Sequence, residues 1–130
     1  MLGFLAAFII TIVLEAVVAL FLLRRRYDVQ LIIRNVIIAS TLTLPFVWFV
    51  FPNKVWLEYS MRIYFASQTV LPVLGLGSWI LQTTLAEIFA FGIETIVYRF
   101  LFNGMSWRGA IVCSFIANFA SFSIGLVLPL

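Results

Sequence analysis

The sequence predicts an all-α membrane protein whose four transmembrane helices form two similar hairpins, and three observations lead to this fold class. Hydrophobic residues make up 65% of the 130-residue chain and charged residues only 10%, a balance that a soluble domain of this size could not carry on its surface. Residues 4–23 form an apolar run with one acid, ended by three arginines. About 20 such residues cross a bilayer core. In addition, an acid followed about 25 residues later by polar residues occurs twice in the chain.

The first hairpin is expected to consist of helices over residues 4–23 and 29–51, joined by the basic turn 24–28. Because positive residues collect on the cytoplasmic side of a membrane, the turn is expected inside the cell and the N-terminus outside. Pro45 is expected to kink the outer half of the second helix without breaking it. Trp48 is interpreted as part of the aromatic belt at the outer interface.

The second hairpin is expected to consist of helices over residues 80–102 and 109–130, joined by the turn 103–108. The Asn103-Gly104 pair is a helix-ending signal. Arginines on both sides of the turn, Arg99 and Arg108, place it in the cytoplasm as well. Both ends of the chain are therefore expected outside a plasma (cytoplasmic) membrane.

The whole chain, residues 1–130, is expected to be a single transmembrane domain. It divides into hairpin one over 1–52, an outer linker over 53–79 and hairpin two over 80–130. The linker mixes aromatic and charged residues, as interfacial helices do, and is then interrupted by Pro72, Gly75 and Gly77. An interfacial or partly re-entrant linker is preferred to a fifth span, because a fifth span would put the arginines of the second hairpin outside.

The two hairpins are interpreted as a parallel repeat. Ser40 lies 25 residues after Glu15, and Asn118 lies 24 residues after Glu94. Each hairpin thus carries an acid on its first helix and polar residues on its second. Two hairpins of the same orientation would be related by a pseudo-twofold axis along the membrane normal.

Three acids, Glu15, Glu87 and Glu94, fall inside the predicted spans. A charged carboxylate at mid-bilayer costs roughly 3 kcal/mol on insertion scales, so these side chains are expected to face protein. The polar residues that could accompany them are Arg34, Ser40, Thr43, Ser114, Asn118 and Ser121. Together they form a candidate intramembrane polar site for protons or cations. No catalytic, cofactor or metal site is expected.

The alternative is that these residues only hold helices together. In that case Arg34 would reach Glu15, and Arg99 or Arg108 would reach Glu94, from the cytoplasmic side. This structural interpretation is preferred for Glu15 and Glu94. Glu87 has no obvious cation nearby and is the stronger candidate for a functional acid.

One stripe of small and polar residues on the last helix is expected to contact another protein. A four-helix bundle should not be able to bury every polar stripe of the chain, and small residues allow a partner helix to approach closely. The stripe consists of Ser114, Asn118, Ser121 and Gly125. Replacing Gly125 and Ser121 with leucine is therefore expected to loosen association.

The block from Ser40 to Pro52 resembles one found in a largely uncharacterised family of small bacterial four-span integral membrane proteins. The second half is similar to the same family at Glu87, Glu94, Tyr98, Ser114, Asn118, Ser121 and Gly125. The chain departs from the family pattern at Ser40, where asparagine is usual, and at Leu44, where histidine is usual. The departures argue against a metal or proton role for that block. The resemblance implies a polytopic architecture and no established activity.

The residue types limit the functions that the chain could have. It has no histidine and one cysteine, which excludes histidine-ligated haem or zinc and an iron–sulfur cluster. It also lacks a glycine-rich phosphate loop, so neither an enzyme nor a cofactor is expected. The net charge of +3 is interpreted as a topology signal, with no nucleic-acid partner.

The function favoured by the sequence is that of a non-enzymatic subunit or building block of a homo-oligomeric or larger membrane complex. Its partners would be the lipid bilayer and further copies or other membrane subunits. The alternative is a small oligomeric proton- or cation-coupled transporter or channel that uses the intramembrane glutamates. Since a lone four-helix bundle is expected to have a packed centre, permeation should require oligomerisation.

Overall fold

The computed structural model describes residues 2–51 and 78–127, and within them every regular element is helical. The all-α class is therefore confirmed. The elements are α1 (Leu2–Leu23), α2 (Val29–Pro45), the π-helical segment η1 (Phe46–Val50), α4 (Ser78–Leu101) and α5 (Trp107–Val127). The predicted linker over 53–79 lies outside the described residues, except that its last two residues already belong to α4.

Three of the described helices are long and apolar enough to cross a membrane, which indicates a membrane-embedded protein. They comprise residues Gly3–Leu23, Val29–Val50 and Trp107–Gly125. The helix α4, which carries two glutamates and Arg99, is not among them. Four spans therefore stay a prediction.

The side chains of α1 are arranged as in a membrane helix rather than a soluble one. Large apolar side chains that are more than half exposed recur at every fourth position, at Ile9, Val13 and Val17. Small or polar side chains are buried on the other face, at Ala7, Glu15 and Ala19. Lipid can cover the first face, and close packing against neighbouring helices favours the second.

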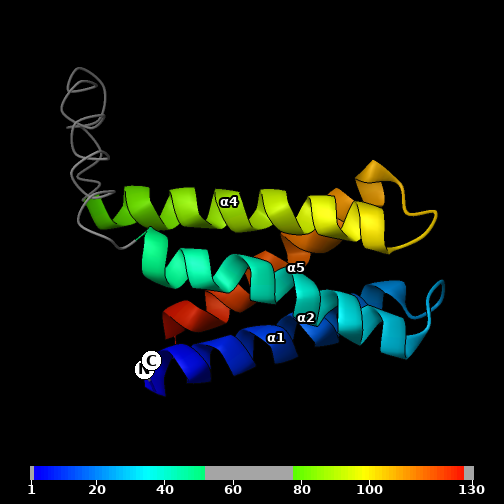
Figure 1. The fold of residues 1–130 in the computed structure, drawn as a ribbon, viewed down its shortest axis with the longest axis horizontal. Helices are drawn as coiled ribbons and strands as arrows, with labels where there is room; N and C mark the ends of the chain where they lie inside the picture. The colour runs from blue at the N-terminus through cyan, green and yellow to red at the C-terminus, as the bar shows by residue number, and fades with distance from the viewer. Residues whose placement is uncertain (1, 52–77, 128–130) are drawn as a thin grey trace.

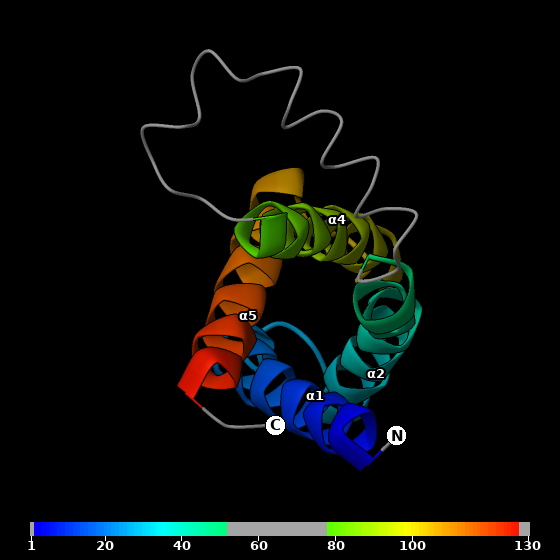
Figure 2. The ribbon, with the colours of Figure 1, turned by 90° about the vertical axis from the view of Figure 1, so that its left-hand side faces the viewer.

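The four helices surround one central axis (Figures 1 and 2). α1 packs against α2 and α5, and α4 packs against the same two helices, so that α1 and α4 lie diagonally opposite (Figure 2). Both short turns lie at one end of the bundle, here called the arginine end. The start of α1, η1, the start of α4 and the end of α5 lie at the other end (Figure 1), here called the open end.

Local hydrogen bonds explain where the two turns begin and end. The Asp28 carboxylate accepts a hydrogen bond from the Gln30 N–H and so caps α2. The Ser106 hydroxyl accepts one from the Gly109 N–H at 3.1 Å, so α5 begins two residues earlier than the sequence suggested. Gly104 has a φ of +77°, a conformation that favours glycine, as the helix-ending signal predicted.

The chain stays helical beyond Pro45, the last residue of α2. Proline has no N–H to donate to the preceding turn, and the chain continues beyond it as the π-helical segment η1. The Phe51 N–H donates to the Phe46 carbonyl, five residues back, at 3.1 Å. A widened turn therefore follows Pro45, and the kink stays a prediction. Single π-helical turns inside α-helices are frequent at functional sites.

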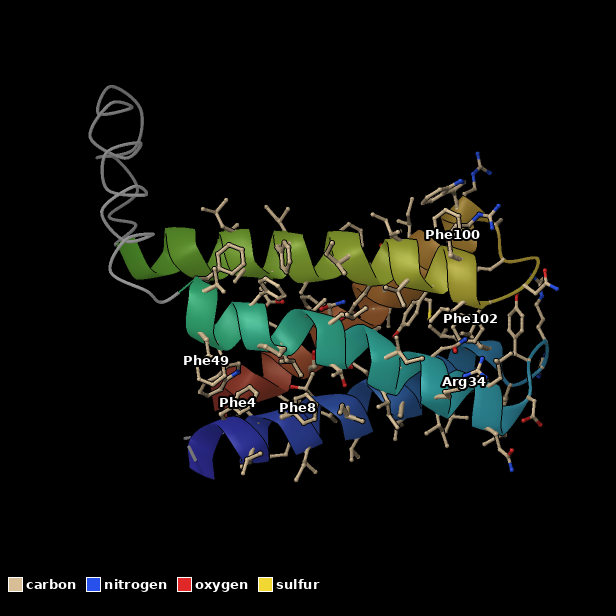
Figure 3. All side chains as sticks on the ribbon, in the orientation of Figure 1. Phe4, Phe8, Arg34, Phe49, Phe100 and Phe102 are labelled. Carbon is tan, nitrogen blue, oxygen red and sulfur yellow. The ribbon has the colours of Figure 1, made fainter. Side chains whose placement is uncertain are left out.

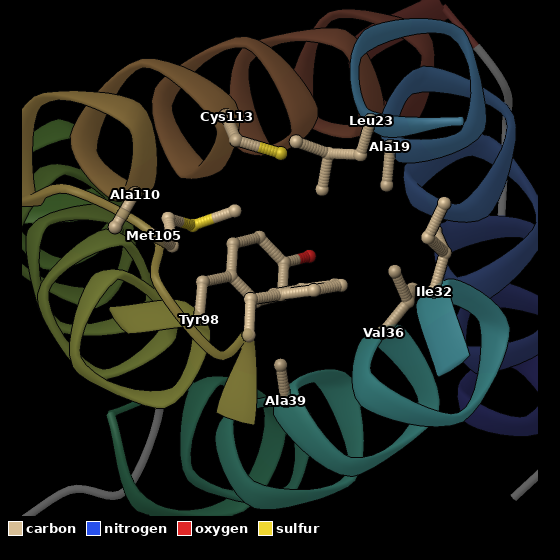
Figure 4. Packing of buried hydrophobic residues seen from close by; sticks show 10 residues of the cluster. Ala19, Leu23, Ile32, Val36, Ala39, Tyr98, Met105, Ala110 and Cys113 are labelled. Carbon is tan, nitrogen blue, oxygen red and sulfur yellow. The ribbon is translucent and has the colours of Figure 1, made fainter. Parts of the chain in front are cut away.

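A packed apolar cluster fills the half of the bundle next to the arginine end. Its buried members are Ala19, Leu23, Ile32, Val36, Ala39, Tyr98, Phe102, Met105, Ala110 and Cys113. Tyr98 lies in the middle of this cluster (Figure 4), and its hydroxyl has no hydrogen-bond partner among the described residues. Figure 3 shows Phe102 near the arginine end, and Phe4 and Phe49 near the open end. The cluster closes the arginine half of the bundle.

Candidate functional site

Glu15 is buried in the centre of the bundle and is only 1% exposed. Its carboxyl group lies between two helices that flank α1. The Ser40 hydroxyl of α2 lies 2.6 Å from Oε2, and the Ser121 hydroxyl of α5 lies 3.3 Å from Oε1. Glu15 therefore faces protein, and both its oxygens have hydroxyl partners.

Glu94 has the matching environment on the opposite helix and is also 1% exposed. The Asn118 amide of α5 donates to Oε2 at 2.5 Å, and the Thr43 hydroxyl of α2 lies 3.2 Å from Oε1. The same amide donates to the Ser114 carbonyl at 2.9 Å. All partners of both glutamates among the described residues are neutral, so no basic side chain of this part of the chain balances the two buried carboxyl groups.

Each hydroxyl beside a glutamate also lies beside a carbonyl of its own helix. Ser40 Oγ is 2.9 Å from the Val36 carbonyl, and Thr43 Oγ1 is 3.1 Å from the Ala39 carbonyl. Ser121 Oγ is 3.1 Å from the Asn118 carbonyl. A hydroxyl has one proton to donate and two lone pairs to accept with. It can therefore donate to a carboxylate, or accept from a protonated carboxyl group while donating to the helix carbonyl.

A cavity of about 410 Å³ adjoins these groups and is lined by all four helices. Its polar lining residues are Thr11, Glu15, Thr43, Glu87, Glu94, Asn118 and Ser121. Its other lining residues belong to the same half of each helix, the half nearest the open end, as Ala7, Val47 and Gly125 illustrate. Among the described residues that line it there is no lysine or arginine. The bundle thus combines an acidic cavity in one half with the apolar cluster in the other.

This cavity corrects the expectation that a single four-helix bundle would have a packed centre. The inward faces of α1, α4 and α5 near the open end carry small residues, namely Ala7, Ala90 and Gly125. Such side chains are too short to fill the central space between four helices. Space for a ligand therefore exists within one copy of the chain.

Glu87 lines the same cavity and lies about two helical turns before Glu94 on α4. It is less buried than Glu15 and Glu94. Within the described residues no hydrogen bond to its carboxyl group is formed. The structure thus brings all three predicted acids to one cavity and leaves the most exposed of them free to meet a ligand.

The arginines do not pair with these acids. Arg34 is exposed, and its Nε donates to Oδ1 of Asn35 at 3.3 Å; Figure 3 shows it near the arginine end. The Arg99 guanidinium lies 5.6 Å from the centroid of the Trp107 ring. The predicted contacts of Arg34 with Glu15 and of Arg99 or Arg108 with Glu94 were therefore wrong. The described partners of the two glutamates are instead serine, threonine and asparagine side chains.

Most of the stripe on α5 faces the interior of the bundle, and only Gly125 is exposed. Ser114 is fully buried and donates to the Phe91 carbonyl at 3.1 Å. Asn118 and Ser121 contact the two glutamates, and Gly125 lines the cavity. A single bundle can therefore bury most of this stripe, and the predicted contact of the stripe with another protein stays a prediction. Since Ser121 and Gly125 both line the cavity, leucine at these positions would also reduce its volume.

Two aromatic residues of the cavity were not recognised from the sequence. Trp48, interpreted as an interface anchor, lines the cavity from η1, and Phe122 lines it from α5. The Trp48 ring packs edge-on against Phe4 of α1, with ring centroids 5.7 Å apart. Position could have suggested Phe122, since it follows Asn118 by one helical turn. The role of Trp48 depends on the π-helical turn, which the sequence pattern does not indicate.

Comparison of the chain with protein-family models, with curated proteins and with solved structures finds no match.

Proposed function

We propose that this chain is a small polytopic membrane protein that binds protons or cations in the acidic cavity and carries them across the membrane. The observation that supports this most is the convergence of Glu15, Glu87 and Glu94 on one cavity whose described lining residues include no basic side chain. Ionisable residues inside membrane proteins are costly and mark ion pathways or proton relays when they face a cavity. Transport is therefore preferred to the role of complex subunit that the sequence favoured.

The hydrogen bonds of the glutamates support proton exchange in particular. When Glu15 is charged, the Ser40 hydroxyl donates to it. When Glu15 is protonated, it donates to Ser40, whose own proton turns to the Val36 carbonyl. Because buried polar groups left without partners cost about 1–3 kcal/mol, a site satisfied in both states can gain and lose a proton without that penalty.

The α5 stripe gives the subunit function little further support, because most of its residues contact the interior of the bundle. Assembly into homo-oligomers or with other membrane subunits stays a proposal, and a transport function does not require it, since the cavity lies within one chain.

We further propose four spans, with the arginine end in the cytoplasm of a plasma membrane and the open end outside. Six of the eight basic residues lie beside the two short turns, which the positive-inside rule assigns to the cytoplasm. In this orientation the cavity faces the outside, and the apolar cluster separates it from the cytoplasm. Transport then requires a second state in which that cluster opens.

The hairpin repeat is also a proposal, supported by equivalent contacts. Ser40 and Asn118 each contact the glutamate of their own hairpin. Thr43 and Ser121 each contact the glutamate of the other hairpin. A pseudo-twofold axis along the bundle would exchange these pairs. Such an axis and the family resemblance both agree with a polytopic membrane protein.

Proton flux into liposomes tests the transport function. The purified chain is reconstituted with a pH-sensitive dye inside, and a potassium diffusion potential drives proton entry. We expect flux well above that of protein-free liposomes, and loss of this flux with Glu87→Gln. Glu87 is the best position for this change, because its carboxyl group has no hydrogen-bond partner among the described residues, so that the amide should not disturb the fold.

Asp28→Asn is the matched control, since it makes the same carboxyl-to-amide change at an exposed site outside the cavity. Asparagine is as good a helix cap as aspartate, so α2 should stay intact and flux should be unchanged. Wild-type flux no greater than that of empty liposomes would refute proton transport. Equal flux in wild type and Glu87→Gln would refute the route through the cavity.

A further inference from the structure

We infer that the cavity recognises a small organic ammonium ion, held between the carboxyl groups of Glu15, Glu87 and Glu94 and the indole ring of Trp48. This inference rests on the proposed function and names the substrate class of the same site. Size, charge and the aromatic wall each support it separately.

The size of the cavity favours an organic cation over a bare ion. The volume of about 410 Å³ would hold about a dozen water molecules at roughly 30 Å³ each, far more than a proton or a dehydrated metal ion needs. It lies within the range of roughly 300–1,000 Å³ that is typical of pockets for organic ligands. The described residues also contain no cluster of three or more histidine, cysteine, aspartate or glutamate side chains suited to a metal ion.

The charge of the lining selects for a cation. Three carboxyl groups face the cavity, and its described lining includes no lysine or arginine. An anion would be repelled, and a neutral ligand would leave the buried carboxyl groups uncompensated. The remaining walls include apolar side chains such as Ile10 and Leu44. A positive charge on a small hydrocarbon body matches both parts of this surface.

The aromatic wall selects for an ammonium centre. Tryptophan is the side chain that binds cations best through its ring face, and Trp48 lines the cavity that contains the three acids. The edge-to-face contact between the Trp48 and Phe4 rings, whose centroids are 5.7 Å apart, holds the indole in place beside the cavity. A Trp48 that served only as an interface anchor would have no effect on ligand affinity.

Calorimetry with a matched pair of probes tests this recognition on the full chain in lipid nanodiscs. The probes are choline and 3,3-dimethylbutan-1-ol, which has the same shape with a carbon in place of the charged nitrogen. We expect choline to bind and the alcohol not to. Choline binding should disappear with Glu87→Gln and weaken as the pH falls, because protons compete for the same carboxyl groups.

Substitutions of tryptophan test the aromatic wall. Trp48→Leu should weaken choline binding by roughly 3- to 30-fold, the range measured for cation–aromatic contacts, whereas Trp48→Phe should retain most of the affinity. Trp107→Leu is the control, because Trp107 lies outside the cavity and stacks with Arg99; it should leave the affinity unchanged.

The results separate this inference from the proposed function. Equal binding of choline and the alcohol, or choline affinity unchanged by Trp48→Leu, would overturn the inference. Absence of choline binding together with proton flux that Glu87→Gln abolishes would also overturn it while supporting transport. Selective choline binding that depends on Trp48 and Glu87, without proton flux, would support the inference and refute proton transport.

Discussion

Replacing Asn118 with leucine should lower the free energy of unfolding by roughly 3 kcal/mol, because it leaves a buried carboxyl group without its closest donor. The Asn118 amide is the closest hydrogen-bond donor to Glu94, which is itself only 1% exposed. Leucine has a similar size, so the loss reflects the missing hydrogen bond and not a void. Unfolding of the reconstituted chain in mixed micelles by denaturant measures the change.

The double variant Glu94→Leu with Asn118→Leu should be more stable than the sum of the two single changes predicts, since it removes both polar partners together. Ser123→Ala is the control on the same helix. Its exposed hydroxyl bonds only to the Phe119 carbonyl, so the change should stay within about 0.5 kcal/mol. Additive effects of the two leucines would contradict the coupling between Glu94 and Asn118.

Replacing Gly125 with phenylalanine should block transport while leaving the fold intact. Gly125 lines the cavity, and a Cβ atom at this position would meet nothing within 4 Å. Substitution of a helical glycine does not weaken the helix, since glycine is the less favourable residue there by about 1 kcal/mol. A ring in the cavity should reduce proton flux by roughly tenfold or more, which needs a barrier only about 1.4 kcal/mol higher.

Gly92→Phe is the matched control for this prediction. Gly92 is also helical and also has open space around its Cβ position, but it is not part of the cavity lining. Its substitution should leave the flux unchanged. Equal effects at both positions, or normal flux in Gly125→Phe, would contradict the account. Loss of association without loss of flux would support the intermolecular role first expected for this face.

Hydrophobic patterning was enough to predict the helical class and the inward orientation of the acids, because a carboxyl group in lipid must find protein partners. Ser40, one of the polar residues named as possible companions of the acids, does contact Glu15. The arginine contact failed for a geometric reason. Arg34 and Ser40 are six residues apart and so point about 120° apart around the helix. Only one of them can face Glu15.

The cavity itself could not be predicted from the sequence. Its volume depends on the distances between four helices that pack around one axis, and no local sequence pattern determines those distances. The stripe of small residues was visible on α5, but whether Gly125 faced a partner or the interior required the tertiary structure. The placement of Trp48 likewise follows from the π-helical turn after Pro45. The positions of the acids could therefore be predicted from the sequence, but the cavity between them could not.

The side of the membrane from which water reaches the cavity tests the central claim most directly. With Cys113 replaced by alanine, a cysteine at Thr11 can be labelled by a membrane-impermeant thiol reagent added to either side. Thr11 lines the cavity, whereas Val13 on the same helix faces outward and is 54% exposed. We expect Thr11→Cys to react only from the side opposite Arg24–Arg26, and Val13→Cys, in lipid, not to react. Labelling of Thr11→Cys from the arginine side, or from neither side, would contradict an acidic cavity open at the other end.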